Sequence, residues 1–156
     1  MRRPWNRPEL PVYSLSTSDG IRHNMNICTY VTAISMQPKR FIIGVYKGTF
    51  TEALLKKQPK CVLQLLSYDQ YRLVELLGKK SGHNINKTER IKDKTGIFYS
   101  IPFLRESCSI ILCEAKQWTD AGDHYAVLCN VITARNLSAD PVLTTGILRE
   151  KKIIRA

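Results

Sequence analysis

The chain has 156 residues, of which 44% are hydrophobic and 24% charged, an ordinary composition for one globular domain. Its formal net charge of +11 predicts attraction to anions, so nucleic acid, a membrane surface and phosphorylated small molecules are all candidate partners. The densest basic cluster, residues 79–94, lies in a polar stretch that is typical of a solvated loop. It has neither interleaved aromatic residues nor a nucleic-acid-binding motif, and we therefore expect no nucleic-acid partner.

The cysteines and the apolar runs indicate in which cellular compartment the protein works. The cysteines are odd in number and mostly lie inside apolar runs, which indicates buried free thiols: Cys28, Cys61, Cys108, Cys113 and Cys129. Cys108 and Cys113 are five residues apart and would point to opposite faces of one strand, so we expect no metal site. Residues 1–11 contain no apolar stretch like that of a secretory signal, and no run approaches the ~20 apolar residues of a membrane helix. We expect a cytoplasmic protein without a membrane partner.

The first part of the chain predicts an arm followed by strands. Residues 1–9 are rich in Pro and Arg and lack periodicity, so residues 1–10 are expected to form an extended arm before a single domain over 11–156. Residues 11–17 and 24–30 have extended patterns on either side of the turn residues 18–20, which predicts a hairpin. Residues 33–36 end at Gln37-Pro38, and the continuous apolar run 41–46 has the length of a strand.

Two capped helices are expected next. Thr49 followed by Glu52 is a capping-box pattern, and the helix that it opens continues to residue 57 and ends before Pro59. After an apolar strand over 61–66, Ser67 and Gln70 form a second capping-box pattern. It begins a helix over 68–77, with an apolar stripe.

The second half of the chain reads mainly as strands. Residues 82–96 form a polar loop with a short helix around 87–91, followed by strands over 97–104, 107–116 and 124–133. The last two strands are joined by a turn at 120–123, and a basic end follows over 149–155. Strands separated mainly by turns, with two or three short helices, favour a mainly β fold built as an antiparallel barrel. The pattern G-x-G-x-x-G is absent, which argues against a Rossmann fold.

Four stretches, in this order, resemble the flavin-reductase-like family, whose fold is the FMN-binding split β-barrel. They are residues 11–20 (PVYSLSTSDG), residues 24–38 (NMNICTYVTAISMQP), residues 41–52 with 60–70 (FIIGVYKGTFTE and KCVLQLLSYDQ), and residues 122–131 (GDHYAVLCNV). The resemblance implies FMN as cofactor, NADH or NADPH as hydride donor, and a homodimer with the flavin near the subunit boundary. It also makes a separate oxygenase a candidate downstream partner. A non-catalytic flavin-binding or flavin-sensing protein of the same fold remains the alternative.

The candidate cofactor residues fall into two groups. Lys47 precedes the helix that Thr49 caps, and a helix N-terminus with a lysine and hydroxyl donors suits a phosphate. The candidate phosphate residues are Lys47, Thr49 and Thr51, and Phe50 between them is a further candidate cofactor-binding residue. The resemblance places the flavin ring along the strand pair that contains Asn26, Cys28, Thr29, Ala33, Ile34 and Ser35. The alternatives are that Lys47 is simply solvated, that Thr49 only caps its helix, and that the strand is an ordinary half-buried one.

His124, in the sequence Gly-Asp-His, is the candidate catalytic residue. Hydride transfer between a nicotinamide and a flavin requires no protein acid or base, so the protein's task is to stack and orient the two rings. The resemblance places His124 near the mouth of the flavin site, where it would contact the nicotinamide or a flavin edge. The alternative is a structural hydrogen bond at the start of a strand.

Overall fold

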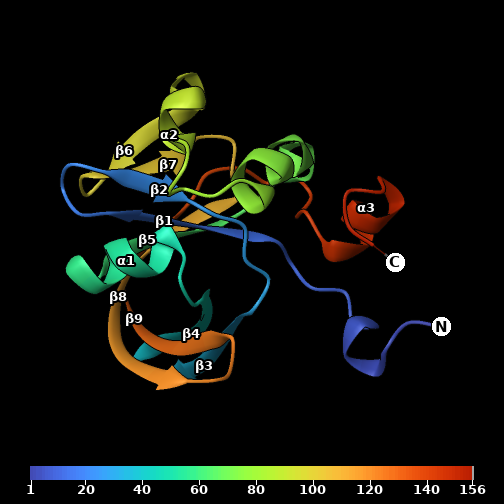
Figure 1. Ribbon diagram of the computed structural model, residues 1–156, viewed down its shortest axis with the longest axis horizontal. Helices are drawn as coiled ribbons and strands as arrows, with labels where there is room; N and C mark the ends of the chain where they lie inside the picture. The colour runs from blue at the N-terminus through green and yellow to red at the C-terminus, as the bar shows by residue number, and fades with distance from the viewer. Residues whose placement is uncertain (156) are drawn as a thin grey trace.

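The computed structural model describes residues 1–155 and confirms a mainly β, antiparallel fold (Figure 1). One seven-stranded sheet has the order β2-β1-β5-β8-β9-β4-β3. Its strands are β1 (Tyr13–Ser18), β2 (His23–Met25), β3 (Val31–Met36), β4 (Lys39–Tyr46), β5 (Lys60–Leu65), β8 (Ser109–Asp120) and β9 (His124–Asn136). A separate hairpin is formed by β6 (Thr95–Phe98) and β7 (Ile101–Leu104).

The chain between β2 and β3 closes this sheet into a split barrel. These two strands lie at opposite edges of the sheet order, yet they are consecutive in the sequence. The backbones of Tyr13 in β1 and Cys28 exchange two hydrogen bonds of 2.8 and 2.9 Å. On the other side, the Gly44 N–H in β4 donates to the Tyr30 carbonyl at 2.7 Å. We call residues 26–30 the seam segment, because they join the two edges of the sheet.

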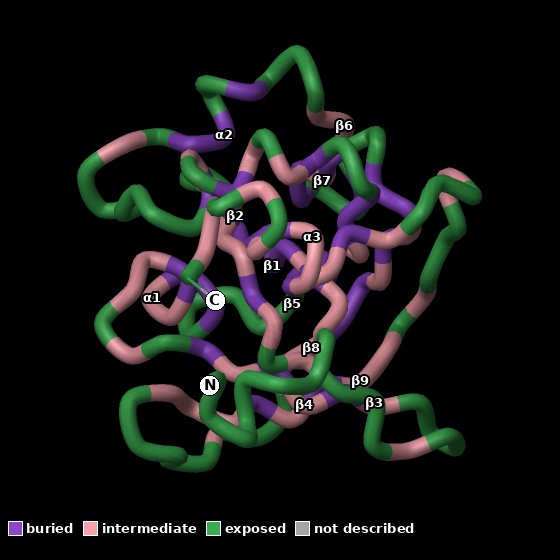
Figure 2. The backbone as a smooth tube through the Cα atoms, turned by 90° about the vertical axis from the view of Figure 1, so that its right-hand side faces the viewer, coloured by how far each residue is buried: buried purple, intermediate pink, exposed green. Residues whose placement is uncertain are grey.

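The core fills the inside of the curved sheet. The pairing of the long strands β8 and β9 shifts register twice, at Leu112/Cys113 and at Ala115/Gln117, and such irregularities bend strands and increase their twist. All five cysteines are free and buried, as predicted, and four of them share one apolar cluster with Leu15, Ile43, Leu63 and Val127. Burial raises the pKa of both Cys28 and Cys113 to about 12, which keeps these thiols protonated. Figure 2 shows the buried backbone along β1 and β5, and more exposed backbone along β3.

Helix α1 (Phe50–Lys57) packs outside the sheet against β1, β2 and β4, with Leu54 and Leu55 buried. The predicted cap is confirmed, since the Thr49 hydroxyl oxygen accepts the Glu52 N–H at 3.3 Å. The returning carboxylate of Glu52 accepts the Gly48 N–H at 2.6 Å instead of the Thr49 N–H. The first turn of α1 is therefore fixed by its own sequence.

Several predicted elements differ in detail. The expected helix over 68–77 is a 3-10 helix (Tyr68–Leu73) followed by a π-helical turn (Glu75–Lys79). The single strand expected over 97–104 is wrong, because the chain reverses at Tyr99 and Ser100 to form β6 and β7. Both turn residues have positive φ, a hairpin geometry usually signalled by Asn or Gly, which this turn lacks.

The remaining helices are short. They are α2 (Lys87–Arg90), near its predicted position, a 3-10 helix (Lys92–Lys94), and α3 (Thr145–Glu150), which was not predicted. The arm contains a 3-10 turn (Pro4–Asn6), so it is not extended throughout. Within residues 1–155, no helix has the length and apolar character needed to cross a bilayer.

Candidate functional site

A cavity of about 510 Å³ opens between the end of β4, the start of α1 and the loop before α2. We call it the main cleft. Six of the residues selected from the sequence line it: Asn26, Lys47, Thr49, Phe50, Thr51 and His124. The other residues that line it are Asn24, Ile27, Tyr46, Gly48, Leu77, Gly78, Lys79, Lys80, Ser81, Gly82 and Lys87. The fold thus joins residues from β4, α1 and β9 with a loop more than 30 positions away from Lys47.

One end of the main cleft is cationic, and its central charge is Lys87. The Lys87 side chain is buried, and its Nζ donates to the carbonyls of Leu77 at 2.8 Å and Met25 at 3.3 Å. A lysine ammonium has three N–H donors, so one remains for a ligand in the cleft. Burial lowers the pKa of Lys87 to about 8. Lys79 and Lys80 line the same end of the cleft.

The residues around the start of α1 have structural partners of their own. The Lys47 Nζ lies 2.8 Å from the Asp120 carboxylate, so its charge is already paired. The Thr49 hydroxyl donates to the Tyr46 carbonyl at 2.7 Å while it caps the helix. The buried Thr51 hydroxyl oxygen accepts from the Asn24 amide nitrogen at 3.1 Å. The other amide atom of Asn24, Oδ1, is buried and has no hydrogen-bond partner among residues 1–155.

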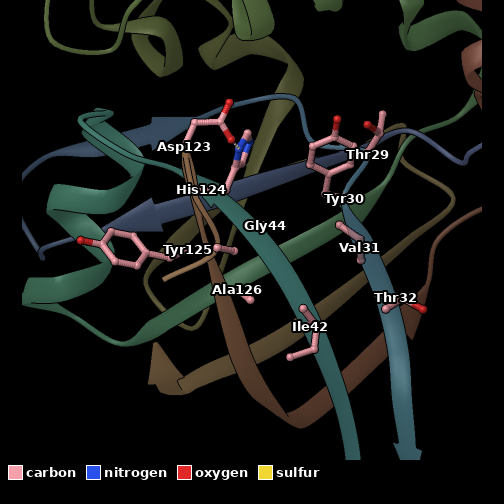
Figure 3. A pocket seen from close by; sticks show the side chains of 11 residues that line it. Thr29, Tyr30, Val31, Thr32, Ile42, Gly44, Asp123, His124, Tyr125 and Ala126 are labelled. Atoms are coloured by element: carbon pink, nitrogen blue, oxygen red, sulfur yellow. Dashed lines mark hydrogen bonds and ion pairs between the residues drawn. The ribbon is translucent and has the colours of Figure 1, made fainter. Parts of the chain in front are cut away.

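The opposite end of the cleft leads into an apolar cavity of about 430 Å³ (Figure 3). We call it the ring cavity. It is lined by Thr29, Tyr30, Val31, Thr32, Ile42, Gly44, Ala121, Asp123, His124, Tyr125 and Ala126. A smaller cavity of about 130 Å³, lined partly by Cys28 and Tyr46, lies between the two. Gly44 is required at this point, because a Cβ there would lie 2.9 Å from the Cβ of Tyr30 on the seam segment.

His124 is the residue that all three cavities share. Its Nδ1 lies 2.7 Å from the Asp123 carboxylate, and this hydrogen bond lowers the pKa of Asp123. The imidazole packs edge-on against Tyr46, with ring centroids 4.7 Å apart, and faces Tyr30 at 5.3 Å. Figure 3 shows His124 and Asp123 at the upper rim of the ring cavity, across from Tyr30. His124 thus makes a hydrogen bond at the start of its strand and also borders the cavities, while its contact with a nicotinamide or a flavin edge stays a prediction.

The remaining predicted ring residues belong either to the seam segment or to β3. In the seam segment, the Asn26 side-chain oxygen accepts the Leu15 N–H at 3.0 Å, Cys28 lines the small cavity, and Thr29 lines both the small cavity and the ring cavity. Ala33, Ile34 and Ser35 lie farther along β3, at a register shift, and line none of these three cavities. Their part in flavin binding stays a prediction.

Comparison with known proteins decides the family. The model of the flavin reductase like domain matches residues 6–146, most of the chain. The chain belongs to the flavin reductase like family. A candidate diflavin flavoprotein A 2 of Nostoc sp. is 24% identical over 86% of this chain, and an uncharacterized protein of Pyrococcus abyssi is 26% identical over 72% of it. The matches span 23% of the Nostoc protein and 65% of the Pyrococcus protein.

Solved structures of this fold agree closely with the chain. The NADH:FAD oxidoreductase of Streptomyces globisporus has a TM-score of 0.83 at 17% identity, covering 92% of this chain and 85% of its own. An FMN-binding protein of Thermus thermophilus has a TM-score of 0.79 at 18% identity, covering 89% of this chain and 77% of its own. These likenesses confirm the split-barrel fold.

The residues that line the cleft of this flavin reductase like chain fit a flavin mononucleotide. The phosphate needs cationic donors, which the lysine end supplies, and the flat ring needs an apolar slot, which the ring cavity supplies. The unpartnered Asn24 Oδ1 is a buried acceptor on the wall of the cleft, suited to a hydroxyl of the connecting chain. The loop lysines were missed as site residues because the sequence showed only a polar, basic stretch there.

Proposed function

We propose that this chain is an FMN-binding flavin reductase that transfers hydride from NADH or NADPH to the flavin. The observation that carries the proposal is the polarity of the linked cavities, which are cationic at Lys87, apolar at Tyr30 and joined at His124. When bound, FMN supplies the ring that accepts two electrons as a hydride while the nicotinamide is oxidised. The chain's own groups then have only to bind the flavin, orient the nicotinamide against it and enclose the two rings.

Binding of the phosphate falls to Lys87, Lys79, Lys80 and the first N–H groups of α1. The remaining donor of Lys87 and the partial positive charge of the helix end both favour a dianion. Lys47 contributes less to this site than expected from the sequence, because Asp120 holds its ammonium. The cationic end therefore fixes one end of the cofactor.

Orientation of the nicotinamide falls to His124. Its Nδ1 is held by Asp123, so the Nε2 side of the ring is available to a ligand at the rim. The contacts with Tyr30 and Tyr46 restrict rotation of the imidazole. A fixed donor at the rim can position the hydride donor without touching the flavin phosphate.

The flavin absorption band, and its bleaching by a reduced nicotinamide, test this proposal. The purified protein, loaded with FMN, is expected to show a flavin absorption band that NADH or NADPH bleaches in anaerobic stopped-flow experiments. A band that neither donor bleaches would favour the alternative, a non-catalytic flavin-binding or flavin-sensing protein. Absence of any flavin binding would refute both.

A homodimer is part of the proposal. The seam segment, β3 and β9 expose large apolar side chains: Tyr30 is 62% exposed, Ile34 52%, Met36 86% and Ile132 46%. Apolar side chains that gather on one face mark a contact surface, and a second copy placed there would also cover the open side of the ring cavity. This arrangement would give Ala33, Ile34 and Ser35 a place at the subunit boundary.

The cellular setting and the acceptor are also proposed. BorF, the flavin reductase component of a bacterial two-component tryptophan halogenase, has the same fold, with a TM-score of 0.80 at 15% identity. By analogy, we infer that this chain hands reduced flavin to a separate oxygenase in the cytoplasm.

A further inference from the structure

The two ends of the chain meet and enclose a cavity that the flavin site does not use. The backbone N–H of Leu10 donates to the Thr145 hydroxyl at 3.0 Å, and the Thr145 N–H donates to the Leu10 carbonyl at 2.9 Å. The Arg149 guanidinium donates to the Asn6 carbonyl at 3.1 Å. The arm is thus bound to α3 of its own subunit. Between them lies a cavity of about 280 Å³, which we call the arm cavity.

The arm cavity has the chemistry of a nucleotide site. Residues 1–10 and 145–155 contain seven Lys or Arg and only two Glu. Of these, Arg149 and Arg155 line the cavity, and no acidic residue among the described part of the chain does. The carboxylate of Glu9, next to this cavity in the sequence, accepts a hydrogen bond from the Thr144 hydroxyl. Trp5 also lines the cavity and is 70% exposed. The Arg3 guanidinium lies over its ring, 5.9 Å from the centroid, so the indole offers a base a flat exposed surface with a cation beside it.

The arm cavity adjoins the ring cavity and not the cationic end of the main cleft. Thr29 and Tyr30 line both the arm cavity and the ring cavity. A ligand with one ring beside His124 can therefore extend past Tyr30 toward Arg149 and Arg155. The flavin phosphate has its own site at Lys87, so the arm cavity is suited to a second phosphorylated molecule.

We propose that the arm cavity binds the adenosine 2′-phosphate half of NADPH, which makes NADPH the preferred donor; this inference rests on the proposed function. The guanidinium groups of Arg149 and Arg155 pair with the 2′-phosphate, which NADH lacks, and Trp5 stacks on the adenine. Arginine suits this role because its planar donors match phosphate oxygens.

The experiment compares three donors and one binding probe. Flavin reduction is measured with NADPH, NADH and reduced nicotinamide mononucleotide, and binding of adenosine 2′,5′-bisphosphate is followed by calorimetry. The variants are Arg155→Gln and Trp5→Ala, both at residues that line the arm cavity. The Arg155 side chain makes none of the hydrogen bonds found among residues 1–155, so its replacement removes no structural contact of that kind. Arg149→Gln is added with the reservation that it also releases the Asn6 carbonyl. Arg105→Gln, in the loop after β7, matches the loss of charge away from the arm.

The expected result is a preference for NADPH in the wild type, and at least a tenfold loss of kcat/KM for NADPH in Arg155→Gln. Rates with reduced nicotinamide mononucleotide and in Arg105→Gln should be unchanged. Equal use of NADPH and NADH, or unaltered bisphosphate affinity in Arg155→Gln and Trp5→Ala, would overturn the inference. If no donor reduces the flavin, the proposed function fails, but the bisphosphate titration still decides whether the arm cavity binds the nucleotide.

Discussion

Replacement of Lys87 by Met is expected to weaken FMN binding selectively. Lys87 has its ammonium buried beside the main cleft, with two N–H donors on the carbonyls of Leu77 and Met25 and one donor left. Met preserves most of the aliphatic stem and removes the charge. The change also leaves the carbonyls of Leu77 and Met25 without this donor, so the comparison of FMN with riboflavin isolates the contribution of the phosphate.

The magnitude follows from the loss of one hydrogen bond to a charged group, about 1.5–3 kcal/mol. This corresponds to a rise of roughly 10- to 150-fold in the Kd for FMN. Riboflavin has the same ring and polyol but no phosphate, so its Kd should change little. Lys57→Met, at the exposed end of α1, removes the same charge outside the cleft and serves as the control.

The lowered pKa of Lys87, about 8, adds a pH signature. Above pH 8 the free protein loses the ammonium, whereas the bound phosphate holds the proton on, so FMN affinity should fall by up to about tenfold per pH unit. Without ligand the sign for folding is opposite. The unfolded state binds more protons than the folded state between pH 8 and about 10.5, so stability contributed by this group rises with pH over that window.

Fluorescence titration of FMN and riboflavin, on wild type and both variants at pH 7 and pH 9, measures all of these quantities. Equal losses for the two flavins in Lys87→Met would show that Lys87 does not contact the phosphate. A wild-type FMN affinity that does not change between pH 7 and pH 9 would contradict the titration argument.

Four other changes test separate parts of the site. Lys47→Ala should also weaken FMN more than riboflavin, but by less than Lys87→Met, because Asp120 already pairs with Lys47; a larger loss than in Lys87→Met would reverse this ranking. His124→Ala should leave FMN affinity nearly unchanged and slow reduction by NAD(P)H, and rates that stay at the wild-type level in a stable, FMN-loaded variant would remove His124 from the mechanism. Thr49→Ala removes the cap that holds the Glu52 N–H and should lower the free energy of unfolding by about 1 kcal/mol in urea titrations; an unchanged midpoint would mean that the cap contributes nothing. Sedimentation at micromolar concentration with FMN should show a dimer, and a monomer would exclude the proposed contact.

The elements that depend on nearby residues were predictable. The apolar run of β4, the cap at Thr49 and the turn before His124 each depend on signals within a few positions, and the structure contains all three. The hairpin of β6 and β7 was not predictable, since tertiary packing holds Tyr99 and Ser100 at positive φ without Gly or Asn. α3 was not predictable either, because its six residues show no clear periodicity and the helix is held by contacts with the distant arm.

The candidate site was predictable only where it is local in sequence. Residues 47–51 lie together in the chain and line the main cleft, and their pattern together with the family resemblance predicts a phosphate site there. Lys87 joins them across nearly 40 positions, and nothing in its polar neighbourhood indicates that folding will bury it. Ala33, Ile34 and Ser35 were expected beside the flavin ring, but the pairing of β3 with β4 shifts register between Ala33 and Ser35, an irregularity that the sequence does not signal.

The seam segment couples the closure of the barrel to occupation of the site. Residues 26–30 hold the two sheet edges together through few backbone hydrogen bonds, and the same residues form walls of the linked cavities. A ligand bound there adds its contacts to this junction, and its binding free energy stabilises the junction against local opening. Amide hydrogens of Cys28 and Gly44 would thus exchange with solvent more slowly in the loaded protein, while those between β5 and β8 would keep their rates. Binding of the cofactor would thus stabilise the closed barrel at the junction between the two sheet edges.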